Sequence, residues 1–262
     1  MTADEPSDIQ GVLTALRVVV DETEAAGDRV GYFAALYRQV TLAVAAAVDE
    51  GVFDDGPRLS RFDAAFGNRY LRALRAHRAS PDGDGVPKCW RLAFEACTGS
   101  GPVIVQHLVL GVNAHINLDL AVAAAQTCPG DAIDDLKGDF DRINAILAAV
   151  MGRLDATLAG FSPLMGGLDA VLGRLDEEIL GFKLDKARAE AWDAAVLLAH
   201  QPAAARPATE RMLDRYAAGL ARLVLAPPWP VPAALDVVRF TERTPVAEVV
   251  RGLDRIPGVT GG

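Results

Sequence analysis

The stretch from Pro102 to Ala125, PVIVQHLVLGVNAHINLDLAVAAA, constrains the fold more than any other part of the sequence. Read as a helix, it is about 36 Å long at ~1.5 Å per residue, and apolar residues surround it on every side. Such a helix belongs in the middle of a protein, so its strongly polar residues are predicted to be buried. These residues are His107, Asn113, His115, Asn117 and Asp119. Because an unpaired buried polar group costs roughly 1–3 kcal/mol, each needs a partner from the protein, from water or from a metal ion.

The remainder of the chain predicts further helices around this one. Ala, Leu, Val, Arg and Asp are abundant, and a hydrophobic share of 51% in 262 residues is ample for a substantial core. We therefore expect an all-α fold, a single domain over residues 1–262, built as a multi-helix bundle around the buried helix at about 102–125. Successive prolines forbid a helix at 226–232, so residues 226–262 are expected to form an extended, Pro-rich strap with a short terminal helix.

Charge and cysteine content exclude several classes of protein. A net charge of -9 without a basic stripe argues against nucleic-acid binding, which needs Lys and Arg to neutralise phosphates. Three cysteines without C-x-x-C spacing suggest neither a disulfide framework nor a thiolate zinc site, and the N-terminus lacks the pattern of a secretory signal. We expect a cytoplasmic protein with no integral membrane segment, because the central stretch carries too many polar residues for a bilayer. Homo-oligomerisation stays open.

Two polar pairs lie on the central helix at a spacing that brings side chains together. His115 and Asp119 are four residues apart, so an imidazole nitrogen and a carboxylate oxygen can reach one metal ion. His107 lies two turns earlier on the same broad face, and Gly111 between them leaves room for a ligand or another backbone. The pair Asn113 and Asn117 is better suited to tying neighbouring helices together.

Further candidates come from the neighbouring predicted helices. The turn at Cys128-Pro129-Gly130 is short, so a helix from about Ala132 to Ala159 is predicted to begin beside the end of the central helix. Asp139 or Asp141 could therefore meet His115 and Asp119. In the helix from Arg58 to Ala79, most charges are expected to form a solvated face, with Asp63 and Arg69 as the exceptions.

Four other side chains raise the alternative of a pocket. Tyr37 and Thr41 could face one, although a Tyr on an apolar stripe is more often a core residue with its hydroxyl at the rim. Trp90 is expected in the core or in a pocket wall. Arg188 could grip an anionic group or stack on Trp192. Leu168 to Leu180 is predicted to be an amphipathic helix.

The octapeptide Asn113-Ala114-His115-Ile116-Asn117-Leu118-Asp119-Leu120 is preceded by Phe66-Gly67-Asn68-Arg69-Tyr70-Leu71-Arg72-Ala73-Leu74 and Trp90, and followed by Asp141-Arg142-Ile143-Asn144. With these segments the chain resembles a family of all-helical actinobacterial proteins classed as a domain of unknown function. The N-A-H-I-N-x-D-L box carries the resemblance, which covers most of the chain and implies no activity. A weaker similarity links the chain to all-helical zinc phosphoesterases, which also use a His-x-x-x-Asp pair on a central helix, but their full set of histidines is absent.

The residues suggest a metal-dependent hydrolase acting on a small, partly apolar substrate. His107, His115, Asp119 and Asp139 would hold zinc, iron or manganese, while Asp141, Asn113 and Arg69 would act in catalysis. One alternative is a metal-free helical protein that binds a small molecule or a lipid; another is a non-haem iron oxygenase. Metal-free acid–base chemistry by the His–Asp pair is also conceivable. A further alternative is a polar network that fixes helix register.

Overall fold

The computed structural model describes residues 5–81, 83, 85–162 and 184–256. Within these ranges every regular element is a helix, which confirms the predicted all-α class. The helix predicted at Leu168 to Leu180 lies outside the described residues.

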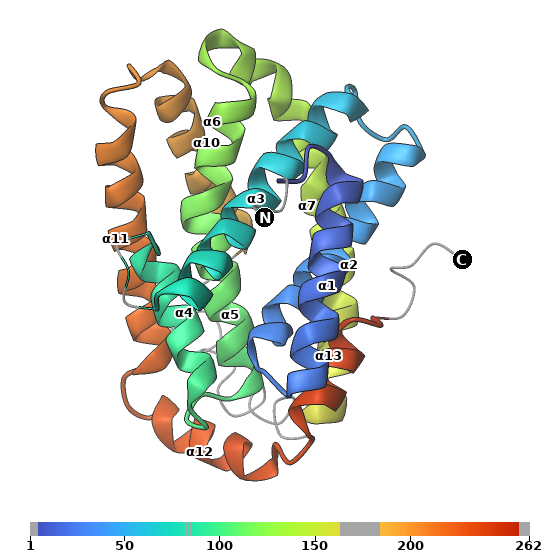
Figure 1. Ribbon diagram of the computed structural model, residues 1–262, viewed down its shortest axis with the longest axis vertical. Coiled ribbons are helices and arrows are strands. Elements are labelled where there is room, and N and C mark those ends of the chain that lie inside the picture. The colour runs from blue at the N-terminus through green and yellow to red at the C-terminus, as the bar shows by residue number, and fades with distance from the viewer. Residues whose placement is uncertain (1–4, 82, 84, 163–183, 257–262) are drawn as a thin grey trace.

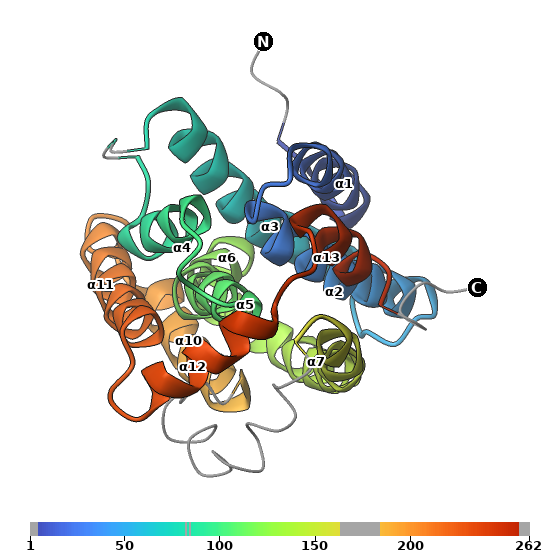
Figure 2. The ribbon, with the colours of Figure 1, turned by 90° about the horizontal axis from the view of Figure 1, so that it is seen from below.

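The predicted central helix forms and is buried. It consists of α5 (Ile104–Ala114), a turn of π-helix named η1 (His115–Leu120) and α6 (Ala121–Thr127). Figure 2 shows it near the middle of the bundle, with α4 and α11 on one side and α2 on another. Apolar side chains around its whole circumference explain this position, because a helix that is apolar on every face must be covered on every face.

Figure 1 shows the helices that surround the central one, coloured in chain order from blue to red. Their bounds are α1 Ile9–Ala26, α2 Val30–Asp49, α3 Gly56–Ala79, α4 Lys88–Thr98, α7 Ile133–Phe161, α10 Leu184–His200, α11 Arg206–Leu225, α12 Val231–Thr241 and α13 Val246–Leu253. Local capping sets several of the boundaries. Asp8 accepts a hydrogen bond from Gly11 N at 2.8 Å and starts α1, and Asp55 accepts one from Arg58 N at 2.8 Å and starts α3. Gly27 ends α1 in the left-handed conformation.

The C-terminal segment contains the predicted short terminal helix, α13, but is less extended before it than the prolines predict. The chain is non-helical at 226–230, but α12 then begins at Val231 with Pro232 in its first turn. Proline is tolerated there because the first turn of a helix has no intrahelical partner for its N–H groups. The segment therefore folds into two helices, of which α12 crosses one end of the bundle and α13 lies beside α1 and α2 (Figures 1 and 2).

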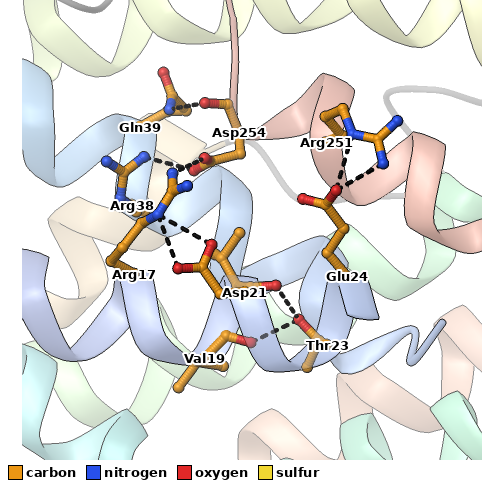
Figure 3. A network of polar contacts seen from close by, with 10 residues as sticks. Arg17, Val19, Asp21, Thr23, Glu24, Arg38, Gln39, Arg251 and Asp254 are labelled. Atoms are coloured by element: carbon orange, nitrogen blue, oxygen red, sulfur yellow. Dashed lines mark hydrogen bonds and ion pairs between the residues drawn. The ribbon is translucent and has the colours of Figure 1, made fainter. Parts of the chain in front are cut away.

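The residue after α13 ties the C-terminal segment to the first two helices (Figure 3). The Asp254 carboxylate accepts hydrogen bonds from Arg17 Nη1 at 2.9 Å and from Arg38 Nη1 at 2.7 Å. Its backbone carbonyl accepts a third from Gln39 Nε2 at 2.5 Å. This contact joins segments from opposite ends of the described chain, because Gln39 and Asp254 are 215 residues apart.

Three helices in the described ranges are long and apolar enough to cross a membrane, judged by length and composition alone: Val30–Asp49, Ile104–Thr127 and Gly130–Phe161. In the most apolar window of the central helix, 89% of the residues are buried inside the protein. The absence of an integral membrane segment stays a prediction.

At Gly111, α2 packs closely on the central helix. A Cβ there would lie 2.4 Å from Cγ and Cδ2 of Phe33, so the space expected for a ligand or a backbone is filled by an aromatic ring. We expect Gly111→Ala to lower the free energy of unfolding by about 1–3 kcal/mol through overpacking. Gly219→Ala in α11 is the matched control, because a Cβ there meets no atom within 4 Å and alanine favours helix by about 1 kcal/mol. Urea denaturation of both variants measures the difference, and a stabilised Gly111→Ala protein would contradict the packing.

Candidate functional site

The polar centre of the fold lies where the central helix changes to a π-helical turn at His115–Leu120. Such turns within α-helices occur frequently at functional sites. All six residues of the turn are buried. The turn keeps His115 and Asp119 in contact, as their spacing predicts, with Nδ1 of the histidine 3.2 Å from Oδ2 of the aspartate.

Asp119 is saturated by protein donors. Its Oδ1 accepts a hydrogen bond from Arg69 Nε at 2.8 Å, and its Oδ2 accepts one from Trp90 Nε1 at 2.8 Å. The carboxylate is only 1% exposed, so a single buried negative charge is matched by the Arg69 guanidinium and two further polar groups. Trp90 therefore serves as a core residue whose indole N–H helps to hold Asp119.

His115 presents its second nitrogen to the interior. The hydrogen bond to a carboxylate assigns the proton to Nδ1, which leaves Nε2 with a lone pair. Burial lowers the pKa of His115 despite the opposing effect of Asp119, so the neutral form is favoured. The ring lies against Phe66, with ring centroids 3.5 Å apart, and edge-on to Tyr37 at 4.4 Å. Nε2 has no hydrogen-bond partner in the described part of the chain.

A cavity of about 80 Å³ opens beside His115. Its walls come from α2, α3, the central helix, α7 and α10, and most of the lining side chains are apolar. The polar side chains in its lining are Tyr37, Asp63, His115 and Arg188. Arg188 is already engaged, because its guanidinium donates to Asn144 Oδ1 at 2.5 Å and to the Phe140 carbonyl at 2.8 Å. The stack of Arg188 on Trp192 is thus replaced by a contact over the Phe140 ring, at 4.2 Å from the guanidinium carbon to the ring centroid.

Asp63 and Tyr37 are polar residues of this cavity that the rest of the described chain leaves unpartnered. Oδ2 of Asp63 and the hydroxyl of Tyr37 are buried without a hydrogen-bond partner among the described residues. Burial raises the pKa of Asp63 from 3.8 to about 7. Burial and the nearby carboxylates of Asp63 and Asp119 raise the pKa of Tyr37 well above its usual value. The Tyr37 hydroxyl is therefore a buried group and does not lie at the rim of the bundle.

The expectation that Asp139 or Asp141 meets His115 is wrong. Asp139 is fully buried but accepts hydrogen bonds from the backbone amides of Asp54 and Asp55, at 2.8 and 3.2 Å, between α2 and α3. Asp141 is exposed and pairs with Lys137 one turn earlier in α7. The short turn between the central helix and α7 determines where α7 begins, but not its rotation about its own axis. The observed rotation directs Asp139 toward the connection between α2 and α3.

His107, a predicted metal ligand, and Asn113, a predicted catalytic residue, also contact other parts of the protein. Nδ1 of His107 lies 3.8 Å from Cys97 Sγ. Asn113 Nδ2 donates to the Ala217 carbonyl at 2.8 Å. Asn113 therefore ties α11 to the central helix, which is the structural role that its spacing from Asn117 favours. Asn117 Nδ2 in turn donates to Asn113 Oδ1 at 2.8 Å.

The predicted metal ligands therefore do not assemble. Only His115 and Asp119 are in contact, and the structure places His107 and Asp139 with other partners. Within the described ranges, no group of three or more His, Cys, Asp or Glu side chains is arranged to hold a metal ion. Arg69 pairs with the Asp119 carboxylate, and its role in catalysis stays a prediction.

Comparison with known proteins identifies the family. A model described as a family of unknown function (DUF5995) matches residues 9–227. The chain belongs to this family. No curated protein and no solved structure matches it. All residues that line the cavity fall inside the matched range of the DUF5995 family, whereas α12 and α13 lie beyond it.

Proposed function

We propose that this protein binds a small, predominantly apolar molecule in the cavity beside His115, without a metal ion. The observation that carries this proposal is that three residues lining one apolar cavity each have a buried polar atom without a hydrogen-bond partner in the described part of the chain: Asp63 Oδ2, the Tyr37 hydroxyl and His115 Nε2. Each such atom costs free energy when it is left unpaired. A ligand that forms hydrogen bonds with these atoms removes that cost, and this favours binding.

The shape of the lining supports an apolar ligand with one polar end. Aromatic and aliphatic side chains form most of the walls, which favours burial of hydrocarbon. His115 supplies an acceptor and Tyr37 a donor. A volume of about 80 Å³ exceeds the ~10–15 Å³ that one water molecule requires, and it suits a small ring or a short chain.

The metal-dependent hydrolase has less support from the geometry. Both oxygens of Asp119 already accept hydrogen bonds, and His115 Nδ1 faces the same carboxylate. A zinc, iron or manganese ion would have to displace these partners, and an iron oxygenase would meet the same obstacle. The hydrolase stays a prediction. Two further predictions also stay so: that the N-A-H-I-N-x-D-L box is the signature of the family, and that the protein is of actinobacterial origin.

A second candidate is acid–base catalysis on the bound molecule. Asp119 fixes the tautomer of His115, and Nε2 is free to accept a proton from a ligand in the cavity. This arrangement matches the base and its orienting carboxylate in enzymes that use a His–Asp pair.

The test compares molecules that co-purify with the protein and two variants in α7. Met151→Trp fills the cavity, which Met151 lines, and is expected to lower the amount of retained ligand by about tenfold or more. Gly152→Trp is the control, because this neighbouring position is exposed and a Cβ added there would meet no atom within 4 Å. Mass spectrometry of the extracted ligand gives the amounts, and equal retention by both variants would contradict the proposal.

Elemental analysis of the same samples separates the binding proposal from the hydrolase. Near-stoichiometric metal in the protein that is lost in both His115→Ala and Asp119→Ala would support the metal enzyme instead.

A further inference from the structure

We propose that the ligand of this cavity is an organic cation, an apolar amine whose ammonium group pairs with the Asp63 carboxylate. This inference rests on the proposed binding function and names the chemical class of the ligand. It follows from the way in which the protein treats its other buried carboxylates.

Four carboxylates are buried in the described part of the chain, those of Asp63, Asp119, Asp139 and Asp254. Three of them are paired with arginine. Asp119 pairs with Arg69, Asp139 with Arg58 and Arg142, and Asp254 with Arg17 and Arg38 as in Figure 3. Asp63 differs from them, since it has neither an ion pair nor a hydrogen bond with any residue in the described ranges, and its residue is only 7% exposed.

Among the described residues, no cation that lines the cavity pairs with Asp63. Arg188 lines the same cavity, but its guanidinium is held by Asn144 and the Phe140 carbonyl. The other titratable side chains around the cavity are Tyr37 and His115, and burial favours the neutral form of both. A positive charge beside Asp63 must therefore come from outside the described residues, and a ligand can supply it.

The walls around Asp63 suit an ammonium group. Phe62 and Phe66, which flank Asp63 on α3, both line the cavity and have parallel rings with centroids 6.1 Å apart. Phe33 and Tyr37 of α2 add two more rings. Aromatic faces attract cations, and a carboxylate among them selects an amine over a neutral molecule of the same shape. The net charge of -9 also favours the approach of a cation and disfavours that of an anion.

The test uses two probes of nearly equal shape, benzylamine and benzyl alcohol, with the full chain and isothermal titration calorimetry. At pH 8 the amine is expected to bind about tenfold tighter than the alcohol. In Asp63→Asn this difference should vanish while the affinity for benzyl alcohol is kept, which also shows that the variant folds. Asp193→Asn removes an exposed carboxylate of α10 and should leave the difference unchanged.

The dependence on pH gives a second readout. Because burial raises the pKa of Asp63 to about 7, the carboxyl is mostly protonated at pH 5.5 and mostly ionised at pH 8. The preference for the amine should therefore shrink at pH 5.5 in the unmodified protein.

Three results would overturn the inference or its basis. Equal affinity for the two probes at pH 8 would overturn the amine and leave the binding proposal in place. An amine preference that persists in Asp63→Asn would overturn the role of Asp63. Failure of both probes to bind would overturn both proposals.

Discussion

Replacement of Asp119 by alanine is expected to lower the free energy of unfolding by about 3–5 kcal/mol at neutral pH. The substitution leaves the guanidinium of Arg69 without its closest carboxylate, and Arg69 is only 13% exposed at the side chain. It also removes the acceptor of the Trp90 indole N–H and the partner of His115. Loss of one member of a buried ion pair is costly because the remaining charge stays desolvated.

Urea denaturation followed by circular dichroism measures the effect of Asp119→Ala. Asp193→Ala is the control, since this exposed carboxylate should change stability by no more than about 0.5 kcal/mol. A loss below about 1 kcal/mol for Asp119→Ala would show that the cluster around Asp119 contributes as little as a surface ion pair.

The second large effect is expected for Asp139→Ala, again about 3–5 kcal/mol at neutral pH. The carboxylate is fully buried and accepts hydrogen bonds from two backbone amides and from Arg58 and Arg142. Alanine would leave the amides of Asp54 and Asp55 and the Arg58 guanidinium without this acceptor, so the start of α3 would lose these hydrogen bonds to α7.

The stability that Asp139 contributes should depend on pH in a defined direction. Burial raises its pKa, but the hydrogen bonds from the Asp54 and Asp55 amides and from the two arginines outweigh this effect and lower the pKa overall. Its contribution is therefore present above the unfolded pKa of about 3.9 and is lost as the pH falls through the lower folded value. The difference between the protein and Asp139→Ala should shrink between pH 5 and pH 2, and an unchanged difference would contradict this assignment.

A ligand-binding measurement distinguishes the two aspartates. Asp139 does not line the cavity, so folded Asp139→Ala should bind the cavity ligand normally. Asp119→Ala releases Nδ1 of His115, which does line it, and should weaken binding of a ligand that donates to Nε2.

The parts of the site that are local in sequence could be predicted. The apolar circumference of residues 102–125 is enough to place that helix at the centre, and a four-residue spacing is enough to join His115 and Asp119. Both depend only on the geometry of one helix. Asp63 and Arg69 are also predicted from the sequence to be exceptions to the solvated face of their helix, and neither is exposed.

Contacts between helices could not be predicted in the same way. The position of Asp139 depends on how far α7 is rotated about its axis, and a short turn fixes the direction of a helix but not this rotation. The ring of Phe33 over Gly111 depends on which residue of α2 lies opposite that glycine. The π-helical turn and the helix that begins at Val231 likewise result from packing against neighbours.

The attachment of Asp254 has a consequence for the order in which the protein can fold during synthesis. Arg17, Arg38 and Gln39 are synthesised before their common acceptor Asp254, which follows Gln39 by 215 residues. Val250 of α13 covers Gly31 in the same region, where a Cβ would lie 2.8 Å from its Cγ2. On this face the hairpin of α1 and α2 therefore cannot reach its native closure until the ribosome has added Val250 and Asp254.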